Sequence, residues 1–200
     1  MSLNKYIAKQ FANPRGTGGR IVMAVMNRQN AQMYEVTERL LRPQAGDTVL
    51  DIGCGNGAMM ERVARRCDCR LIGTDISGDV LKSAKHRLKG KNVELLCCPV
   101  DDMPIENATV DKALTINTLH FWEDLASGFV EIARVLKPGG LFIGTHYTNQ
   151  SLKTYSHTQF GYRMHAESEI LSAAQNADFA VEVQTIMGGK AYCVVCRRQS

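Results

Sequence analysis

Residues 49–57 read VLDIGCGNG, an apolar run that ends in an acid and is followed by three glycines at alternate positions. Glycine suits places where the backbone takes a positive φ or lies close to a ligand. If the apolar run is a strand and a helix begins after the turn, the helix presents unpaired N–H groups and a partial positive charge. The segment therefore predicts a turn that binds a small ligand, with a dinucleotide's phosphates as one possibility.

The dinucleotide interpretation has support in the sequence. Gly53, Gly55 and Ala58 satisfy the G-x-G-x-x-G/A pattern, and Asp75 follows at the distance where an acid binds ribose hydroxyls. Asp75 suits any adenosine ligand, however, so it does not discriminate. Asp51, two residues before the first glycine, would repel a pyrophosphate and favour an ammonium or sulfonium group. This pattern favours S-adenosylmethionine, which has an adenosine and a cationic centre but no phosphate.

A regular alternation of strands and helices must position these residues. Apolar strands are expected over 47–53, 69–76, 92–99, 109–117, 140–147, 178–186 and 190–198. Helices are expected over 3–11, 21–41, 56–67, 77–90, 121–137 and 166–176. The alternation predicts an α/β fold, a mostly parallel seven-stranded sheet with helices on both faces. Because the last two strands have only a hairpin-length link, one strand near the C-terminus should run antiparallel.

Four segments together resemble the class I S-adenosylmethionine-dependent methyltransferases, of the small-molecule type with a methyltransferase type 11-like domain. The segments are VLDIGCGNG at 49–57, IGTDIS at 72–77, PVDDMPIENATVDKALTINTLHFWED at 99–124 and IARVLKPGGLFIGTHY at 132–147. The N-terminal stretch NPRGTGGRIVMAVMNRQNAQMYEV also resembles a cap of some bacterial members. The resemblance implies a Rossmann-like sandwich with 1–200 as one domain, 1–43 as a helical cap and 148–165 as a possible substrate lid.

The resemblance implies a site for the methionine part of S-adenosylmethionine. Gly53, Gly55 and the turn around them, Cys54 included, would contact this part of the cofactor. Asp51 would interact with its ammonium group, directly or through water. Asn117, at the end of the fourth strand, would line the floor beneath it, although an Asx turn is an alternative role for this residue.

The adenosine part is implied to lie at the next strand. Asp75 would bind both ribose hydroxyls and Ile76 would pack on the adenine, the alternative for Asp75 being a favourable charge at a helix N-terminus. Many family members also have an acid that binds the adenine amino group, and Pro99 stands at that position here. The acids that follow could replace it, or the backbone could bind the adenine edge, and both acids could instead be plain loop residues. The candidates are Val100, Asp101 and Asp102.

Methyl transfer from a sulfonium is an in-line displacement with an activated leaving group, so alignment of the reactants is the main task. Positioning of this kind contributes on the order of 7–11 kcal/mol. A general base is needed only where the acceptor must lose a proton. His120 and Tyr147, just past the fourth strand and at the end of the fifth, are the candidate catalytic residues, with hydrogen bonding or packing as the alternative for the histidine.

Composition and cysteine spacing limit the other function classes. A formal net charge of +4 without a dense basic cluster makes nucleic acid an unexpected partner. No segment suits a membrane span or a secretory signal, so a cytoplasmic protein is expected. The close cysteine pairs have unsuitable spacing or no second pair, which favours buried reduced thiols over a metal site. These pairs are Cys67–Cys69, Cys97–Cys98 and Cys193–Cys196.

The favoured function is therefore methyl transfer from S-adenosylmethionine to a small-molecule acceptor, with S-adenosylhomocysteine as the product and no metal. Three alternatives stay open: a non-catalytic S-adenosylmethionine-binding regulatory module, an NAD-dependent oxidoreductase, and an RNA or protein methyltransferase. Neither the acceptor, nor the methylated atom, nor the oligomeric state follows from the sequence.

Overall fold

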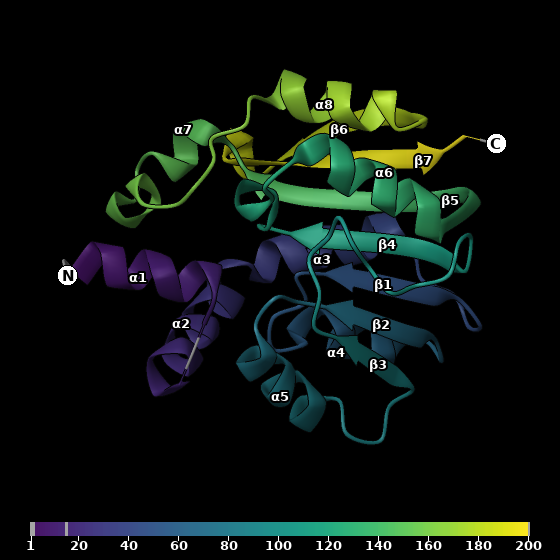
Figure 1. Ribbon diagram of the computed structural model, residues 1–200, viewed down its shortest axis with the longest axis horizontal. Coiled ribbons are helices and arrows are strands. Elements are labelled where there is room, and N and C mark those ends of the chain that lie inside the picture. Colours follow the sequence, from purple (N-terminus) through teal and green to yellow (C-terminus); the bar gives the residue numbers. More distant parts are fainter. Residues whose placement is uncertain (1–2, 15, 200) are drawn as a thin grey trace.

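A seven-stranded sheet runs through the centre of the protein (Figure 1). The computed structural model describes residues 3–14 and 16–199. The strands are β1 (Thr48–Ile52), β2 (Arg70–Thr74), β3 (Val93–Leu96), β4 (Val110–Ile116), β5 (Leu136–Tyr147), β6 (Phe179–Ile186) and β7 (Ala191–Arg198). Their order is β3-β2-β1-β4-β5-β7-β6, and β7 runs antiparallel to both neighbours while the other pairs are parallel. The predicted α/β fold with one antiparallel strand is confirmed.

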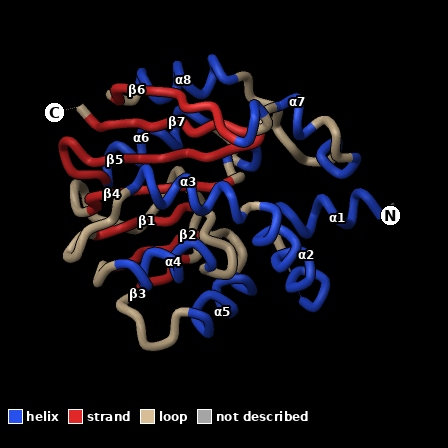
Figure 2. Tube along the Cα trace, turned by 180° about the vertical axis from the view of Figure 1, so that it is seen from behind, coloured by secondary structure: helices blue, strands red, loops and turns tan. Residues whose placement is uncertain are grey.

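Helices cover both faces of this sheet. One face carries α3 (Ala31–Leu41), α4 (Ala58–Arg66) and α5 (Gly78–Arg87), and Figure 2 shows α3 and α4 lying in front of the strands. The opposite face carries α6 (Leu125–Val135) and α8 (Glu167–Asn176). Among the described residues, no helix has the length and apolar character needed to cross a bilayer.

Each face has its own apolar core because the parallel strands alternate their side chains between the two helix layers. Beneath α6, the fully buried rings of Phe129 and Phe142 meet edge to face with centroids 5.8 Å apart. Beneath α3 and α4, the core includes Met33 and Met60. Burying each such side chain contributes roughly 1.5–3 kcal/mol, so the two cores hold the carboxyl ends of the strands in fixed register.

The N-terminal helices extend beyond the sheet at the carboxyl ends of its parallel strands (Figure 1). The helix expected over 21–41 is instead two helices, α2 (Gly16–Gln29) and α3, which meet at Asn30. Asn30 is buried, and its side-chain oxygen accepts a hydrogen bond from Asn117 Nδ2 at 2.8 Å. This tertiary bond fixes the junction, which periodicity alone could not reveal.

The segment that follows β5 packs against the N-terminus. It contains the short helix α7 (Asn149–Leu152) and the 3-10 turn η2 (Ser156–Gln159). Phe11 of α1 (Leu3–Ala12) stacks on His157 of this turn, with ring centroids 4.5 Å apart. Residues far apart in the chain thus meet over the end of the sheet, and the roles of a cap and a substrate lid stay predictions for these two segments.

The expectation of buried reduced thiols is wrong for part of the cysteines. Cys67 and Cys69 form a disulfide. Cys67 follows the end of α4 in an extended conformation, with φ −149° and ψ 158°, and residues two apart in extended chain point to the same side. Cys97 is exposed, whereas the free thiols that are buried belong to Cys54, Cys193 and Cys196.

A buried carboxylate joins α3 to α4. Glu38 is 5% exposed, and its oxygens accept from Arg62 at 2.8 Å and Arg66 at 2.5 Å. Because both arginines stay partly in solvent, replacing the acid leaves no buried charge. We expect Glu38→Gln to lower the free energy of unfolding by about 1–2 kcal/mol in urea denaturation. The matched control is Glu94→Gln, at an exposed pair with Arg70, and an equal loss there would contradict the prediction.

Candidate functional site

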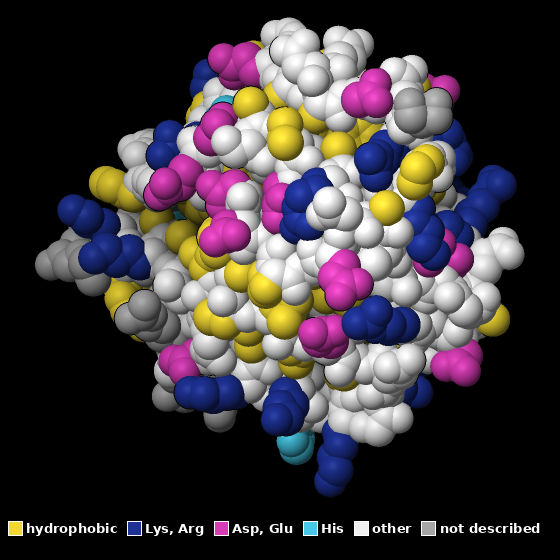
Figure 3. All heavy atoms as spheres, turned by 45° about the vertical axis from the view of Figure 1, so that its right-hand side comes forward, with side chains coloured by type: hydrophobic (Ala, Val, Ile, Leu, Met, Phe, Trp, Pro, Cys, Tyr) yellow, Lys and Arg dark blue, Asp and Glu magenta, His cyan; other side chains and the backbone are white. Residues whose placement is uncertain are grey.

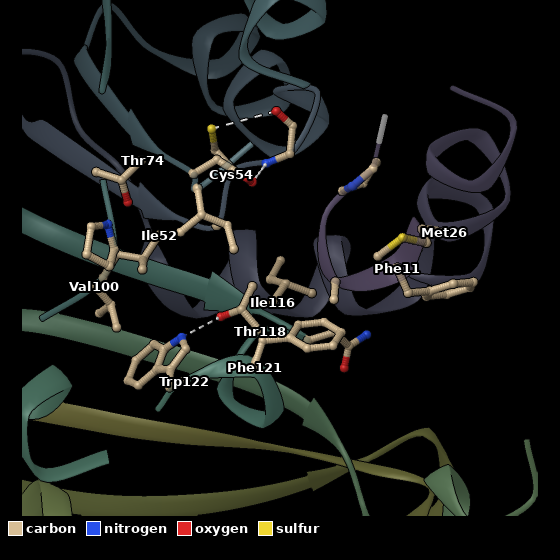
Figure 4. A pocket seen from close by; sticks show the side chains of 18 of the residues that line it. Phe11, Met26, Ile52, Cys54, Thr74, Val100, Ile116, Thr118, Phe121 and Trp122 are labelled. Atoms are coloured by element: carbon tan, nitrogen blue, oxygen red, sulfur yellow. Dashed lines mark hydrogen bonds between the residues drawn. The ribbon is translucent and has the colours of Figure 1, made fainter. Parts of the chain in front are cut away.

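A cavity of about 480 Å³, called here the main cavity, lies at the carboxyl ends of β1, β2 and β4. Ligands of open α/β sheets bind at this edge. Figure 4 shows side chains from the strands and from the N-terminal helices converging on it, with Phe11 and Met26 at the opposite end from Thr74 and Val100. Five parts of the chain therefore line one space: the glycine turn, the end of β2, the segment after β3, the segment after β4, and the N-terminal helices.

The glycine turn forms one wall of the main cavity. Gly53, Gly55 and Gly57 all have positive φ, at 71°, 54° and 75°, and Gly57 is the N-cap of α4. Gly53 N and Cys54 N both donate to the carbonyl of Thr74, which ties the turn to the end of β2. The structure thus brings Gly53, Cys54 and Gly55 to the cavity wall, as the sequence predicted, while their contact with a cofactor stays a prediction.

A side chain at Gly55 would meet an N-terminal helix that lines the same cavity. A Cβ atom there would lie 2.7 Å from Cε of Met23 on α2. We expect Gly55→Ala to weaken S-adenosylhomocysteine binding about tenfold in calorimetric titration, because the φ of 54° costs about 1–2 kcal/mol and the Met23 side chain must move within the cavity wall.

Gly90→Ala is the matched control for this substitution. Gly90 also has a positive φ, at 80°, but a Cβ atom there meets nothing within 4 Å, and the residue lies outside the main cavity. The Gly90→Ala variant should have a lower free energy of unfolding but an unchanged affinity for S-adenosylhomocysteine. Equal affinities for both variants would refute the role assigned to the Gly55 turn.

Asp75 connects the glycine turn to β2. Its Oδ2 accepts from Gly55 N at 3.0 Å and its Oδ1 accepts from Ser77 N at 2.8 Å. Burial raises the pKa of this carboxyl, and the two backbone hydrogen bonds oppose the shift. Asp75 also lines the main cavity, so it both orders the turn and faces the ligand space.

Asp51 lies behind the cavity wall rather than in it. The residue is 4% exposed, and its Oδ2 has no hydrogen-bond partner. Burial raises the pKa of the Asp51 carboxyl to about 7, and the nearby Asp75 adds to the shift. A buried carboxyl without a partner is costly. A bound cation can offset this cost. The unpartnered oxygen of Asp51 therefore fits a ligand that carries an ammonium group.

The charges around the main cavity have one sign. Among the described residues that line it, the charged ones are Asp75, Asp101 and Glu123, all acidic. Such a surface repels phosphates and attracts cations. The residues present therefore fit an adenosine ligand with a positive charge, such as S-adenosylmethionine, better than a pyrophosphate dinucleotide.

The segment after β3 forms the wall where the adenine is expected. Cys98, Pro99, Val100 and Asp101 line the main cavity there, and Ile76 lies in the lining beside Asp75. Asp102 is exposed and lies outside the lining. Of the two acids suggested for the adenine amino group, only Asp101 is thus placed to reach it, and this role stays a prediction.

Asn117 marks the floor of the main cavity. Its backbone has a left-handed conformation, with φ 57°. Its Nδ2 donates to Asn30 Oδ1 at 2.8 Å, and its Oδ1 accepts from Tyr147 N at 3.2 Å. The Asn117 side chain thus bonds to distant residues, whereas the alternative role considered for it was a local Asx turn. These bonds join the ends of β4 and β5 to the junction of α2 and α3.

A second cavity of about 40 Å³ adjoins the first, and Phe11, Met26, Asn30 and Asn117 line both. The two residues predicted to be catalytic, His120 and Tyr147, line this second cavity and not the main one.

The environment of these two residues weakens both as proton acceptors. His120 is 7% exposed, and burial, with smaller effects of His165 and His157, lowers its pKa to about 3. Burial raises the pKa of Tyr147. Near neutral pH, His120 is therefore an uncharged weak base and Tyr147 keeps its proton.

Many lining residues were not singled out from the sequence. They come from the N-terminal helices and from the segment after β4: Ala12, Pro14, Met23, Met26, Asn27, Asn30, Tyr34, Thr118, Phe121, Trp122 and Glu123. The signal for the second group lay in the NTLHFWED segment. The first group had only the resemblance of the N-terminal stretch to a cap. In the described part of the chain, no group of three or more His, Cys, Asp or Glu side chains could hold a metal ion.

Comparison with known proteins gives consistent findings. Residues 50–144 match the family described as "Methyltransferase domain". The chain is 28% identical over 176 residues to an uncharacterized methyltransferase, YdaC, of Bacillus subtilis, covering 87% of this chain and 96% of that one. It spans only 32% to 56% of the length of the next three curated relatives.

Many solved structures share the fold, including these two. One is the putative methyltransferase in complex with the Trm112 activator of Haloferax volcanii, with a TM-score of 0.80, 18% identity and complete coverage of both chains. The other is a geranyl diphosphate methyltransferase in complex with SAM, with a TM-score of 0.75 and 20% identity, covering 94% of this chain and 93% of that one.

Proposed function

Because this chain belongs to the class I S-adenosylmethionine-dependent methyltransferases, we propose that it transfers the methyl group to a small organic molecule by in-line displacement. The observation that carries the proposal is the charge around the main cavity. Its charged described lining is entirely acidic, and Asp51 has an orphaned buried oxygen beside it. This arrangement suits a ligand that carries adenosine and positive charge but no phosphate.

The residues proposed to hold the cofactor divide into two groups. The glycine turn at Gly53 and Gly55, supported by Asp51 and by the floor at Asn117, would hold the methionine part. Asp75 would accept hydrogen bonds from the ribose hydroxyls, and Ile76 with the wall at 98–101 would enclose the adenine. When bound, S-adenosylmethionine supplies an activated methyl group on a positively charged sulfur.

The chain would act mainly by alignment. Phe11, Met26, Asn30 and Asn117 line both cavities, so a group bound in the second cavity lies beside one bound in the first. His120 is too weak a base to remove a proton from an acceptor at neutral pH, because burial favours its neutral form. We therefore assign His120 and Tyr147 to acceptor binding rather than to proton transfer.

A small acceptor is favoured over a macromolecule by the small volume of the second cavity, about 40 Å³, and by the surface charge. On the face seen in Figure 3, Lys and Arg side chains are scattered among acidic ones rather than gathered in one basic groove. A groove of that kind supplies most of the affinity in nucleic-acid binding. The cytoplasmic location stays a prediction from the sequence.

Two measurements test the proposal. Calorimetric titration should show micromolar binding of S-adenosylmethionine and S-adenosylhomocysteine but no binding of NADH; the reverse result would indicate an oxidoreductase. Incubation of the protein with methyl-labelled S-adenosylmethionine and a broad metabolite extract should then label a small molecule. Binding without any labelled product would instead favour a regulatory module, and label in RNA or protein would favour a macromolecular acceptor.

A further inference from the structure

The second cavity is walled by ring-bearing side chains from four separate parts of the chain. Phe11 comes from α1, His120 from the turn after β4, Tyr147 from the end of β5, and the remaining rings from the segment 155–162. The rings from this last segment belong to Tyr155, His157 and Tyr162. Local sequence cannot account for such a gathering, since only the fold brings these elements together.

Two pairs of these rings are stacked face to face, and the others meet at an angle. His120 and Tyr162 are stacked with centroids 4.5 Å apart and planes 12° apart. Phe11 and His157 are stacked at 4.5 Å, and His157 meets Tyr162 edge to face at 5.9 Å. Stacked faces of this kind stabilise a flat partner by about 0.5–1.5 kcal/mol per ring beyond the area buried.

The second cavity also lacks charge. Among the described residues of its lining, none is acidic or basic apart from the two histidines, and burial lowers the pKa of both His120 and His157. An ion moved into such a site loses its hydration without gaining a counter-charge. A cationic acceptor would in addition meet the sulfonium of the cofactor at the junction of the two cavities.

Both asparagine side chains of the lining and two of its hydroxyl groups already have hydrogen-bond partners within the protein. Asn117 Nδ2 donates to Asn30 Oδ1, and the Thr158 hydroxyl donates to the carbonyl of Leu152 at 2.7 Å. The Tyr147 hydroxyl donates to the carbonyl of Gln29 at 3.4 Å. These groups are not free to bind a hydroxyl-rich molecule such as a sugar, and burying its polar groups unpaired would cost binding energy.

From these contacts we propose that the second cavity binds the methyl acceptor, and that this acceptor is an uncharged, flat molecule containing an aromatic ring. The inference rests on the proposed methyl transfer. At about 40 Å³, the cavity has room for roughly one water molecule, so the acceptor must separate rings that now touch. We expect the Phe11–His157 stack to separate, because α1 is weakly anchored. Among the described side chains of α1, only that of Ala8 is buried.

Three probes built on one bicyclic ring test the proposal: 2-naphthol, 2-naphthoate and 2-naphthylmethylammonium, which are neutral, anionic and cationic at pH 7.5. Each is titrated calorimetrically into the full chain saturated with S-adenosylhomocysteine. We expect 2-naphthol to bind at least tenfold more tightly than either ion. Tyr162→Leu and His157→Leu should each weaken 2-naphthol at least fivefold, and Tyr162→Phe should restore most of the loss.

Phe160→Leu is the matched control, because this exposed ring lies in the same segment but outside both cavities, and the variant should bind 2-naphthol like the unaltered protein. Tighter binding of either ion, no binding of any probe, or no effect of both leucine variants would overturn the acceptor class while leaving the methyl-transfer proposal intact. Failure of S-adenosylhomocysteine itself to bind would overturn the methyl-transfer proposal and the inference together.

Discussion

Asp75→Ala should weaken S-adenosylmethionine binding at least a hundredfold. The substitution removes the carboxylate proposed to hold both ribose hydroxyls, and hydrogen bonds to a charged group contribute about 1.5–3 kcal/mol each. It also removes the acceptor of Gly55 N and Ser77 N, so the glycine turn loses one of its supports. Since 1.4 kcal/mol corresponds to a factor of ten, these losses together exceed two orders of magnitude.

Calorimetric titration against Asp102→Ala provides the comparison. Asp102 is an exposed acid from the same edge of the sheet that does not line the main cavity, so its loss should change the affinity less than twofold. The two variants carry the same change in net charge, which removes long-range electrostatics as an explanation. Similar affinities for the two variants would show that Asp75 does not contact the cofactor.

Asp51→Asn should have opposite effects on the free protein and on cofactor binding. In the free protein, burial raises the pKa of this carboxyl to about 7, whereas its ordinary value is 3.8. Between these values the folded form holds a proton that the unfolded form has lost, so the free energy of unfolding falls as pH rises from about 4 to about 7. A shift of this size corresponds to on the order of 4 kcal/mol.

The asparagine variant lacks this titration, so its stability curve should be flatter over the same pH window and should lie above that of the unaltered protein at pH 8. Its affinity for S-adenosylmethionine should be at least tenfold lower, because the negative charge that a cation would neutralise is gone. Urea denaturation at a series of pH values and titration at pH 8 measure the two effects. A variant with the unchanged pH slope, or with unchanged affinity, would contradict the prediction.

Most of the fold could be read from the sequence because the strands have continuous apolar runs and the turns have strong breakers. The helix expected over 21–41 was one exception, since the junction at Asn30 depends on a hydrogen bond to Asn117, which lies far away in the chain. The helix expected over 121–137 was another, because it ends at Val135 and β5 begins at Leu136. The Cys67–Cys69 disulfide depends on the extended backbone after α4, which the cysteine spacing alone did not establish.

The residues of the site likewise fall into those that local sequence determines and those that tertiary contacts determine. The glycine turn and Asp75 lie in local motifs whose geometry follows from one strand–turn–helix unit, so the sequence placed them at the cavity. The contributions of Phe11, Met23 and Asn30 depend on how the N-terminal helices fold back over the sheet, and no local pattern determines that. Asp51 shows a third case: its side chain was expected at the mouth of the turn, and the structure buries it behind the wall.

The contact between α1 and the turn at 156–159 has a consequence for the rate of turnover. Both cavities share the wall formed by Phe11 and Met26, so outward movement of the helices that carry these residues would open both cavities at once. Local opening of a weakly buried helix is faster and less costly than unfolding of the sheet. Amide hydrogens of α1 should thus exchange with solvent well before those of β4, and release of product, rather than the displacement at carbon, would set the turnover rate.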